Sequence, residues 1–321
     1  MSAATMKRET QTAHKIGKKT LLQRMKPYAA LYLMLLPGLA LIVIFCYGPM
    51  YGLQIAFKDY NIGLGIWDSP WVGWEHFQKF LTTDAATRAL TNTIIISTLK
   101  LVFSFPMPIL LALVLNEIGN QAFKRVAQTI SYLPHFISWI IVASLMNNLL
   151  SPSTGVVNAI IQQFGGDPIY FLADKNWFRP ILVITNIWKE IGWSSVVYLA
   201  ALSGIDPSLY EAAIVDGASR IQRIARITLP SIMPIAVTML ILSMGSIMSA
   251  GFDQVFNLYS PQVYDVGDIL DTYVYRRGLV DMSYSFSTAV GLFKSVVGLI
   301  LVVAVNVIAK RLSPDHDAGL W

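Results

Sequence analysis

The stretch EAAIVDGASRIQRIARITLP, residues 211–230, decides the fold of this chain. It is polar and patterned, with charges at Glu211, Asp216, Arg220, Arg223 and Arg226. Apolar runs long enough to cross a bilayer, about 20 residues each, lie on both sides of it. A segment with this many charges is costly to place in lipid. The sequence therefore predicts a membrane protein in which an ordered, water-exposed segment stands between two spans.

The composition also indicates a polytopic membrane protein with an all-α fold. Of the 321 residues, 55% are hydrophobic and 13% are charged, and the mean hydropathy is +0.54. Soluble domains carry roughly 25% charged residues. The single cysteine, Cys46, lies in an apolar run and is expected to pack as a small apolar side chain. The four histidines show no spacing typical of a metal pair, so we predict no metal site.

Six transmembrane helices are predicted from the apolar blocks, at about 29–51, 89–115, 126–150, 180–203, 230–256 and 286–309. We therefore divide the chain into a basic N-terminal segment, a six-helix transmembrane domain that includes a loop, and a short tail. These parts comprise residues 1–28, 29–309 with the loop at 204–230, and 310–321. No cleaved signal peptide is expected, because the N-terminal segment has no apolar core of its own.

The distribution of lysine and arginine sets the orientation. If the N-terminus is cytoplasmic, 14 of the 24 basic residues lie on the cytoplasmic side, 7 on the opposite side and 3 within spans. Cytoplasmic loops carry an excess of such residues. The bias predicts that both termini and the loop at 204–230 are cytoplasmic. It also accounts for the sequence pI of about 9.2 without a nucleic-acid partner.

Two short helices are expected within the cytoplasmic loop. Asp206 is a typical N-cap and Pro207 a typical first-turn residue, which start the first helix. Gly217 permits a sharp break after it. We expect Pro230 and Pro234 to end the second helix.

The second loop helix carries a ridge of arginines beside a ridge of isoleucines. Three basic and three apolar residues recur at the same three-residue spacing: Arg220, Arg223 and Arg226, and Ile221, Ile224 and Ile227. A helix of this kind either docks on another protein, or packs on its own chain or on acidic lipid head groups. The pattern alone leaves both interpretations open.

The spacing within this loop resembles the cytoplasmic loop of ATP-binding cassette importer permeases. That loop reads EAA, three residues, G, nine residues and I-x-L-P. Every spacing is matched here, by Glu211, Ala212 and Ala213, then Gly217, then 227–230, with Asp216 in its usual place. Further stretches, such as WVGWEHF, YLPHFISW and WKEIGWSSVVYLAALSGID, are similar to the carbohydrate branch, more narrowly to permeases for oligosaccharides, including alginate-type importers.

The resemblance implies a type I importer permease in the cytoplasmic membrane of a bacterium, with the loop as its ATPase-coupling element. The residues assigned to coupling are Glu211, Ala212, Ala213, Asp216 and Gly217, to which we add Arg220 and Arg223 from outside the motif. The implied partners are a second, different permease subunit, an ATPase dimer, an extracytoplasmic solute-binding protein, the oligosaccharide and membrane lipid. The chain has no P-loop, so we predict no catalytic residue and no cofactor in it, with ATP and Mg²⁺ bound by the ATPase.

Charged and aromatic side chains at membrane depth are the candidate sugar pathway. They are Lys100, Lys189, Glu190, Trp193, Asp253 and Lys294. Such charges must face the bundle or water. They either contact substrate or tie spans together, for example Glu190 with Lys100 or Lys294. We expect Glu190 to be the structural member of the adjacent pair and Lys189 to be free for substrate.

Two other classes of protein remain as alternatives. An ion-coupled secondary transporter of a small polar solute would use the intramembrane charges and need no ATPase. The matched loop spacing and the lack of an inverted repeat oppose it. A membrane-embedded enzyme would need a nucleophile–base pair or a metal constellation within the spans, and the sequence offers neither.

Overall fold

The structure is a computed structural model that describes residues 26–312. The basic N-terminal segment and the C-terminal tail expected from the sequence fall almost wholly outside these residues. Within the described range the chain is helical, and the β-structure there is an isolated bridge between Lys58 and Trp71. The chain divides into two units, one ending at Leu53 and the other beginning at Gln54.

The first predicted span is a continuous helical stretch, Ala29–Phe57. It consists of helix α2 (Ala29–Ile42), a π turn η2 (Val43–Tyr47) and a 3-10 stretch η3 (Gly48–Phe57). Its side chains up to the end of α2 are exposed. Such an apolar helix requires a covering of lipid or protein, as a membrane span has.

Three long helices of the second unit are also long and apolar enough to cross a membrane. They are the stretch Asp84–Glu117, made of α5 (Asp84–Ser104) and α6 (Pro106–Glu117), the stretch Arg220–Gly245, and α17 (Tyr284–Leu312). Helix α10 (Lys175–Ser203) has 29 residues, which is sufficient length, but Lys189 and Glu190 lower the hydropathy of its middle. Helices therefore occupy the second, fourth and sixth predicted spans.

The third predicted span is wrong as a single straight helix. The chain forms α7 (Gln121–Tyr132) and a 3-10 turn η4 (Leu133–Phe136), and then bends by 100° into α8 (Trp139–Leu149). Ser138 causes the new start, because its side chain accepts a hydrogen bond from the backbone N–H of Ile141 and caps α8. Helix α8 is more apolar than α7, but the two helices together are apolar enough to pass as one span, so composition did not show the bend.

The fifth predicted span, 230–256, is also wrong at its far end. Its helix α13 (Leu229–Gly245) ends at Gly245 and is followed by a 3-10 turn η6 (Ile247–Ser249). Ala250 and Gly251 then take left-handed backbone conformations, with φ of 48° and 87°, and a separate helix α14 (Phe252–Leu258) begins.

The near end of the same helix differs from the prediction as well. We expected Pro230 to end the second loop helix, but α12 (Arg220–Arg223), a π turn η5 (Ile224–Thr228) and α13 follow one another without a break. Pro230 stands in the first turn of α13, directly after the π turn. The wider π turn tolerates a proline here because it shifts the register of the backbone hydrogen bonds. The loop helix is thus continuous with the span.

The remaining elements are short. They are η1 (Lys26–Tyr28), α3 (Gly65–Asp68), α4 (Glu75–Thr82), α9 (Val156–Gln163), α11 (Pro207–Val215), η7 (Pro261–Val263), α15 (Tyr264–Gly267), α16 (Leu270–Tyr275) and η8 (Arg276–Val280).

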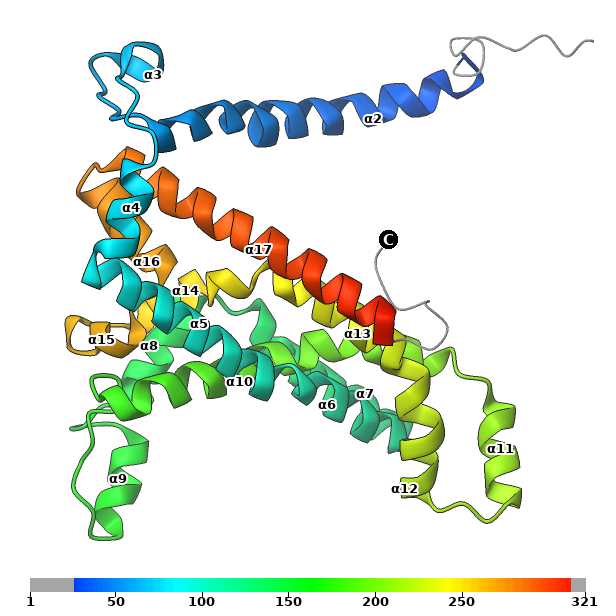
Figure 1. Cartoon of the computed structure of the whole chain (residues 1–321). Helices are drawn as coiled ribbons and strands as arrows, with labels where there is room; N and C mark the ends of the chain where they lie inside the picture. Colours follow the sequence, from blue (N-terminus) through cyan, green and yellow to red (C-terminus); the bar gives the residue numbers. More distant parts are fainter. Residues whose placement is uncertain (1–25, 313–321) are drawn as a thin grey trace, which may run out of the picture. The chain divides into compact units, whose positions relative to one another are not determined.

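Helix α10 is the central element of the second unit (Figure 1). It contacts α5, α6, α7, α13 and α15. Gly192 allows the close approach of α7, because a Cβ at this position would lie 1.9 Å from the carbonyl oxygen of Ser131. The buried apolar cores surround α10 at one end, with Phe178 and Leu182, and at the other, with Tyr198 and Leu202. This packing fixes the helix that carries three of the six candidate pathway residues.

Candidate functional site

The cytoplasmic loop folds as two capped helices joined by a sharp turn, which we call the knuckle (207–228). Asp206 caps α11 by accepting a hydrogen bond from the backbone N–H of Ser208, at 2.9 Å. That backbone bond, together with a second contribution from the Ser208 side chain, holds the pKa of Asp206 below its ordinary value. The start predicted at Asp206-Pro207 is therefore confirmed.

The turn between the helices requires a glycine. Gly217 has a φ of +76°, the left-handed conformation that a Cβ disfavours, and the space around it is open. Shortly after it, Ser219 and Gln222 form a capping box. The side chain of each residue accepts a hydrogen bond from the backbone N–H of the other. The sequence analysis missed this box, although S-x-x-Q at a helix start is its usual signal. The predicted break at Gly217 is confirmed.

The outer surface of the knuckle is apolar and basic. Val215 and Ile221 flank the turn and are 87% and 79% exposed. Arg220 is exposed and Arg223 is half-buried, and neither makes an ion pair within residues 26–312. Unpaired cations around exposed aliphatic side chains are typical of a surface that meets an acidic protein partner. The knuckle also brings together the remaining predicted coupling residues, Glu211, Ala212, Ala213, Asp216 and Gly217.

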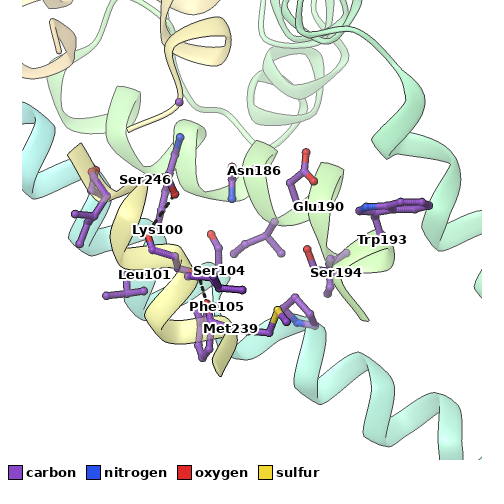
Figure 2. A pocket seen from close by; sticks show the side chains of 18 of the residues that line it. Lys100, Leu101, Ser104, Phe105, Asn186, Glu190, Trp193, Ser194, Met239 and Ser246 are labelled. Atoms are coloured by element: carbon purple, nitrogen blue, oxygen red, sulfur yellow. Dashed lines mark hydrogen bonds between the residues drawn. The ribbon is translucent and has the colours of Figure 1, made fainter. Parts of the chain in front are cut away.

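A cleft of about 640 Å³ lies between α5, α6, α10 and α13. Figure 2 shows Lys100 and Ser104 on one wall, with Asn186, Glu190 and Trp193 of α10 opposite. Hydroxyls, an amide and aliphatic surface alternate along it, and the charged side chains that line it are those of Lys100 and Glu190. The polar part of its lining consists of Ser97, Lys100, Ser104, Asn186, Glu190, Ser194, Tyr198, Ser243 and Ser246.

The amine of Lys100 is not free in the cleft, because it stabilises the break between α13 and α14. Its Nζ donates to the carbonyl oxygen of Ala250 at 2.7 Å and to Oε1 of Gln254 at 2.5 Å. Ala250 belongs to the left-handed pair that separates α13 from α14. The amide of Gln254 donates in turn to the carbonyl of Leu182 on α10, at 2.7 Å. Lys100 therefore satisfies a carbonyl that the interrupted helix leaves without a helical partner.

Lys189 stabilises the other helix break, between α7 and α8. This reverses our expectation that Lys189 is free for substrate and that Glu190 is structural. Lys189 is 5% exposed, and its Nζ donates to the carbonyl oxygens of His135 at 2.5 Å and Pro134 at 3.3 Å. These carbonyls end the helix before the 100° bend. A cation at a helix C-terminus is favourable on both hydrogen-bonding and dipole grounds. Lys189 does not line the cleft.

Glu190, expected to be the structural residue, is the one that faces the cleft. Its Oε2 lies 2.8 Å from Nδ1 of His135 and its Oε1 lies 4.0 Å from Nζ of Lys189, so the expected pairing with Lys100 or Lys294 is wrong. The carboxylate is 33% exposed. The ring of His135 stacks on Trp193, with centroids 4.8 Å apart and planes 5° from parallel. A carboxylate and an indole thus share one wall of the cleft, held by one histidine that the sequence analysis did not single out.

Ser104 is a further cleft residue that the sequence analysis missed. Its Oγ is buried, and among the described residues it has no hydrogen-bond partner. Buried hydroxyls in proteins are nearly always paired, so a lone one in a cleft indicates a contact made with water or ligand. No sequence signal distinguishes this serine from the others.

Two predicted pathway residues lie away from the cleft. Lys294 of α17 pairs with Asp271 of α16, at 2.5 Å, and ties the two helices together. Asp253 is an exposed residue in the first turn of α14. It does not line the cleft, because the helix break places it beyond the end of the fifth span. The structure thus brings Lys100, Glu190 and Trp193 together, with Lys189 directly behind them.

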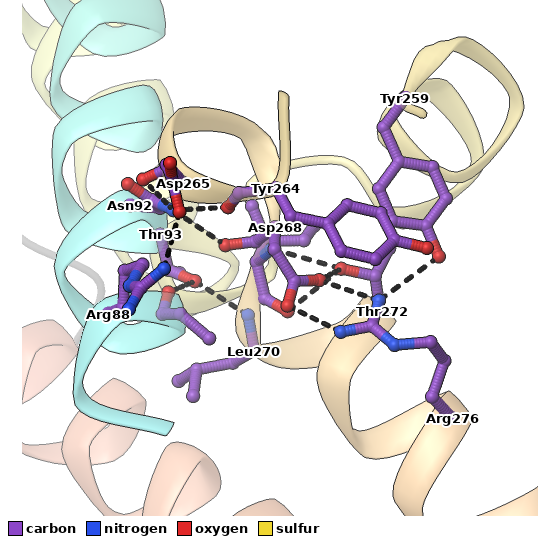
Figure 3. A network of polar contacts seen from close by, with 12 residues as sticks. Arg88, Asn92, Thr93, Tyr259, Tyr264, Asp265, Asp268, Leu270, Thr272 and Arg276 are labelled. Carbon is purple, nitrogen blue, oxygen red and sulfur yellow. Dashed lines mark hydrogen bonds and ion pairs between the residues drawn. The ribbon is translucent and has the colours of Figure 1, made fainter. Parts of the chain in front are cut away.

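A polar network at the opposite end of the second unit from the knuckle (Figure 1) holds the segment 259–276 against α5 (Figure 3). Arg276 makes a two-pronged ion pair with Asp268, at 2.9 and 2.5 Å. The side-chain amide of Asn92 donates to the carbonyl of Asp268 at 3.0 Å. Arg88 and Lys175 both pair with Asp265, whose pKa is lowered chiefly by the hydrogen bond from Lys175 and its charge. This network makes a rigid rim.

The described residues contain no group of three or more histidine, cysteine, aspartate or glutamate side chains that could hold a metal ion. The chemistry that the two regions offer is therefore recognition: a basic, apolar knuckle for a protein surface and a hydroxyl-rich cleft with an indole for a polar ligand.

Comparison with known proteins gives consistent matches. Residues 104–314 match the family model described as binding-protein-dependent transport system inner membrane component. The chain is 48% identical over 285 residues to protein LplB of Bacillus subtilis (strain 168), covering 89% of this chain and 90% of that protein. It is 46% identical over 298 residues to the polygalacturonan/rhamnogalacturonan transport system permease protein YteP of the same organism, covering 93% of each.

A solved structure agrees with these relatives. A chain of a bacterial ABC transporter involved in the import of the acidic polysaccharide alginate superposes with a TM-score of 0.86 at 46% identity, covering 92% of this chain and 100% of that one. A second structure of an alginate transporter, in complex with an alginate pentasaccharide-bound periplasmic protein, matches with the same TM-score at 45% identity.

Proposed function

Because the chain belongs to the family of binding-protein-dependent transport system inner membrane components, we propose that it forms one half of the membrane pathway of an ATP-driven importer of oligosaccharides. Permeases of this family are not enzymes, and ATP hydrolysis takes place in a separate subunit. The observation that carries the proposal within this chain is the knuckle, a capped and exposed pair of helices with unpaired arginines. It offers a docking surface and no catalytic group.

We propose six spans with both termini in the cytoplasm. Four long apolar helices, the bent pair α7–α8 and α10 supply six crossings. The excess of lysine and arginine on one set of loops supports this orientation. It places the knuckle on the side of the ATPase and the network around Asp268 and Arg276 on the side of the solute-binding protein.

The substrate we propose is an oligosaccharide that carries uronic acid groups. Names of the relatives include a polygalacturonan/rhamnogalacturonan system and an importer of the acidic polysaccharide alginate. Within the cleft, the lone hydroxyl of Ser104, the carboxylate of Glu190 and the indole of Trp193 suit a sugar, whose hydroxyls need acceptors and whose C–H face packs on aromatic rings. Lys100 also lines the cleft, but its Nζ is bonded to Ala250 and Gln254, so the acidic substrate is proposed from the relatives and not from a free cation.

We propose that no cofactor binds this chain, and that ATP and Mg²⁺ are held by a dimer of ATPase subunits. A second, different permease subunit would complete the cleft. Six spans enclose too little volume for an oligosaccharide pathway, and the cleft described here is open rather than enclosed. The knuckle of each permease would then meet one ATPase.

Purification in mild detergent followed by vesicle uptake tests this function. We expect the tagged chain to retain an ATPase and a second permease, and the complex with its binding protein to take up a labelled tetragalacturonate only when ATP is present. Chain that purifies alone and moves the sugar with an ion gradient would instead establish a secondary transporter. The methyl ester of the same oligosaccharide is the matched neutral probe, because it differs only in charge.

A further inference from the structure

Besides its covalent connection to α10 through residues 204–206, helix α11 is linked to the second half of the loop by a turn and by a side-chain hydrogen bond. The first is the covalent turn through Gly217, whose left-handed backbone lies in open space. The second is a hydrogen bond between the phenol oxygen of Tyr210 and Oγ1 of Thr228, at 3.0 Å. The two points are separated by most of the length of α11, so together they hold this helix at both ends against the second half of the loop.

The Tyr210 bond is anchored where the loop becomes the span. Thr228 is 1% exposed and is the last residue of the π turn before α13. Its hydroxyl donates to the carbonyl of Arg223 at 3.4 Å, the five-residue spacing of a π turn. Either hydroxyl can be the donor of the bond between Tyr210 and Thr228. The phenol is thereby linked to the backbone of the helix that runs on into the membrane.

A turn with a single glycine transmits bending force poorly. The outer surface of α11 is exposed, with Leu209, Ile214 and Val215 all uncovered. If the turn were the sole link between α11 and the helix that continues into α13, a push on α11 would rotate it about Gly217 and leave α13 in place. The bond from Tyr210 removes that freedom, because rotation of α11 would have to break it.

We propose that the Tyr210–Thr228 hydrogen bond is the brace that makes the knuckle move as one body with the fifth span, so that it sets how much transport each ATP produces. Tyr210 is a positioning residue, since it acts through Thr228 and touches neither substrate nor nucleotide. This inference rests on the proposed function of the knuckle as the contact with an ATPase.

The test measures sugar taken up per ATP hydrolysed in vesicles that contain the complete complex. Tyr210→Phe and Thr228→Val each remove the bond with little change in shape, and a buried hydrogen bond shifts an equilibrium by about three- to tenfold. We expect each variant to retain its ATPase on purification and to lower the uptake per ATP by about that factor. The double variant should be no worse than either single variant, because all three lack the same bond.

Two further variants separate a brace from a general loss of structure. Thr228→Ser keeps the hydroxyl and should restore the wild-type ratio. Ser231→Ala removes a neighbouring hydroxyl that bonds only its own helix, at the carbonyl of Ile227, and should leave the ratio unchanged. A normal ratio in Tyr210→Phe would overturn the brace while leaving the importer function intact. Wild-type chain that retains no ATPase would overturn the importer function itself.

Discussion

Replacing Lys189 by methionine should destabilise the protein far more than neutralising its neighbour Glu190. In Lys189→Met the carbonyl oxygen of His135 loses its side-chain donor, whereas that of Pro134 keeps a backbone partner, the N–H of Ile137 at 3.2 Å. A buried carbonyl left without a partner costs about 1–3 kcal/mol. Loss of a cation from a helix C-terminus adds about 0.3–1 kcal/mol. We therefore expect a loss of about 1–4 kcal/mol in the free energy of unfolding.

The matched variant Glu190→Gln keeps an oxygen that can accept from Nδ1 of His135. Because the carboxylate is partly exposed, the loss of its charge should cost about 0.5 kcal/mol or less. The same change removes a negative charge from the cleft wall, so it should alter uptake. We expect the ratio of tetragalacturonate to methyl-ester uptake to rise, since repulsion of the substrate carboxylate is relieved.

Thermal unfolding of the purified complex, followed by size-exclusion chromatography, separates these outcomes. For a chain of this size, we expect Lys189→Met to lower Tm by about 2–6 °C and Glu190→Gln by about 1 °C or less. Uptake should change in Glu190→Gln with Tm nearly constant. A large Tm loss in Glu190→Gln together with an unchanged Tm in Lys189→Met would show that the lysine does not hold the helix break and would refute this reasoning.

Three further predictions concern the knuckle and the bundle. Gly217→Pro should abolish ATP-driven uptake while the chain still inserts, because proline cannot adopt a φ of +76° and lacks the N–H that bonds the carbonyl of Ile214. Gly217→Asn should retain much of the uptake, and equal uptake in both variants would show that the turn is not needed. Charge reversal at Arg220 and Arg223 together should reduce the amount of ATPase recovered on purification, and the reduction should be larger at low salt than at high salt. Recovery that is the same at every salt concentration would place the arginines outside the contact. Lys294→Met should lower Tm but leave the ratio of acidic to neutral uptake unchanged, since Lys294 binds Asp271 away from the cleft, and a changed ratio would return it to the pathway.

The knuckle could be predicted because its determinants are local. Asp206 caps its helix through the N–H two residues later, and Gly217 supplies the backbone conformation of the turn by itself. Spacing within some 20 residues contains all of this information. The capping box at Ser219 is equally local, since Ser219 and Gln222 are three residues apart.

The helix breaks at membrane depth could not be predicted, because their determinants are distant in sequence. Lys100 satisfies the carbonyl of Ala250, 150 residues away, and Lys189 satisfies that of His135, 54 residues away. From the sequence, a charge at this depth has two interpretations, contact with substrate or a pair with an opposite charge. Each lysine donates to backbone carbonyls that a bend has freed, and Lys189 also lies 4.0 Å from Glu190. Only the tertiary structure reveals the bend.

The same limit applies to Glu190. Two adjacent residues on a helix point about 100° apart, so the sequence shows that one of the pair is turned away from the cleft, but not which. The position of the carbonyl acceptors decides it. Lys189 turns toward the bend at His135, and Glu190 is left at the cleft wall.

The central claim, that the knuckle is the contact with a separate ATPase, is tested most directly by a photocrosslinker placed at Val215. This side chain is 87% exposed at the tip of the knuckle, and Phe164, 86% exposed after α9, is a matched control on the proposed opposite side of the membrane. In membranes that contain the complete transporter, benzoylphenylalanine at 215 should crosslink to the ATPase subunit, and the same probe at 164 should not. A probe at 215 that never captures the ATPase, or capture of the ATPase from 164, would contradict the account.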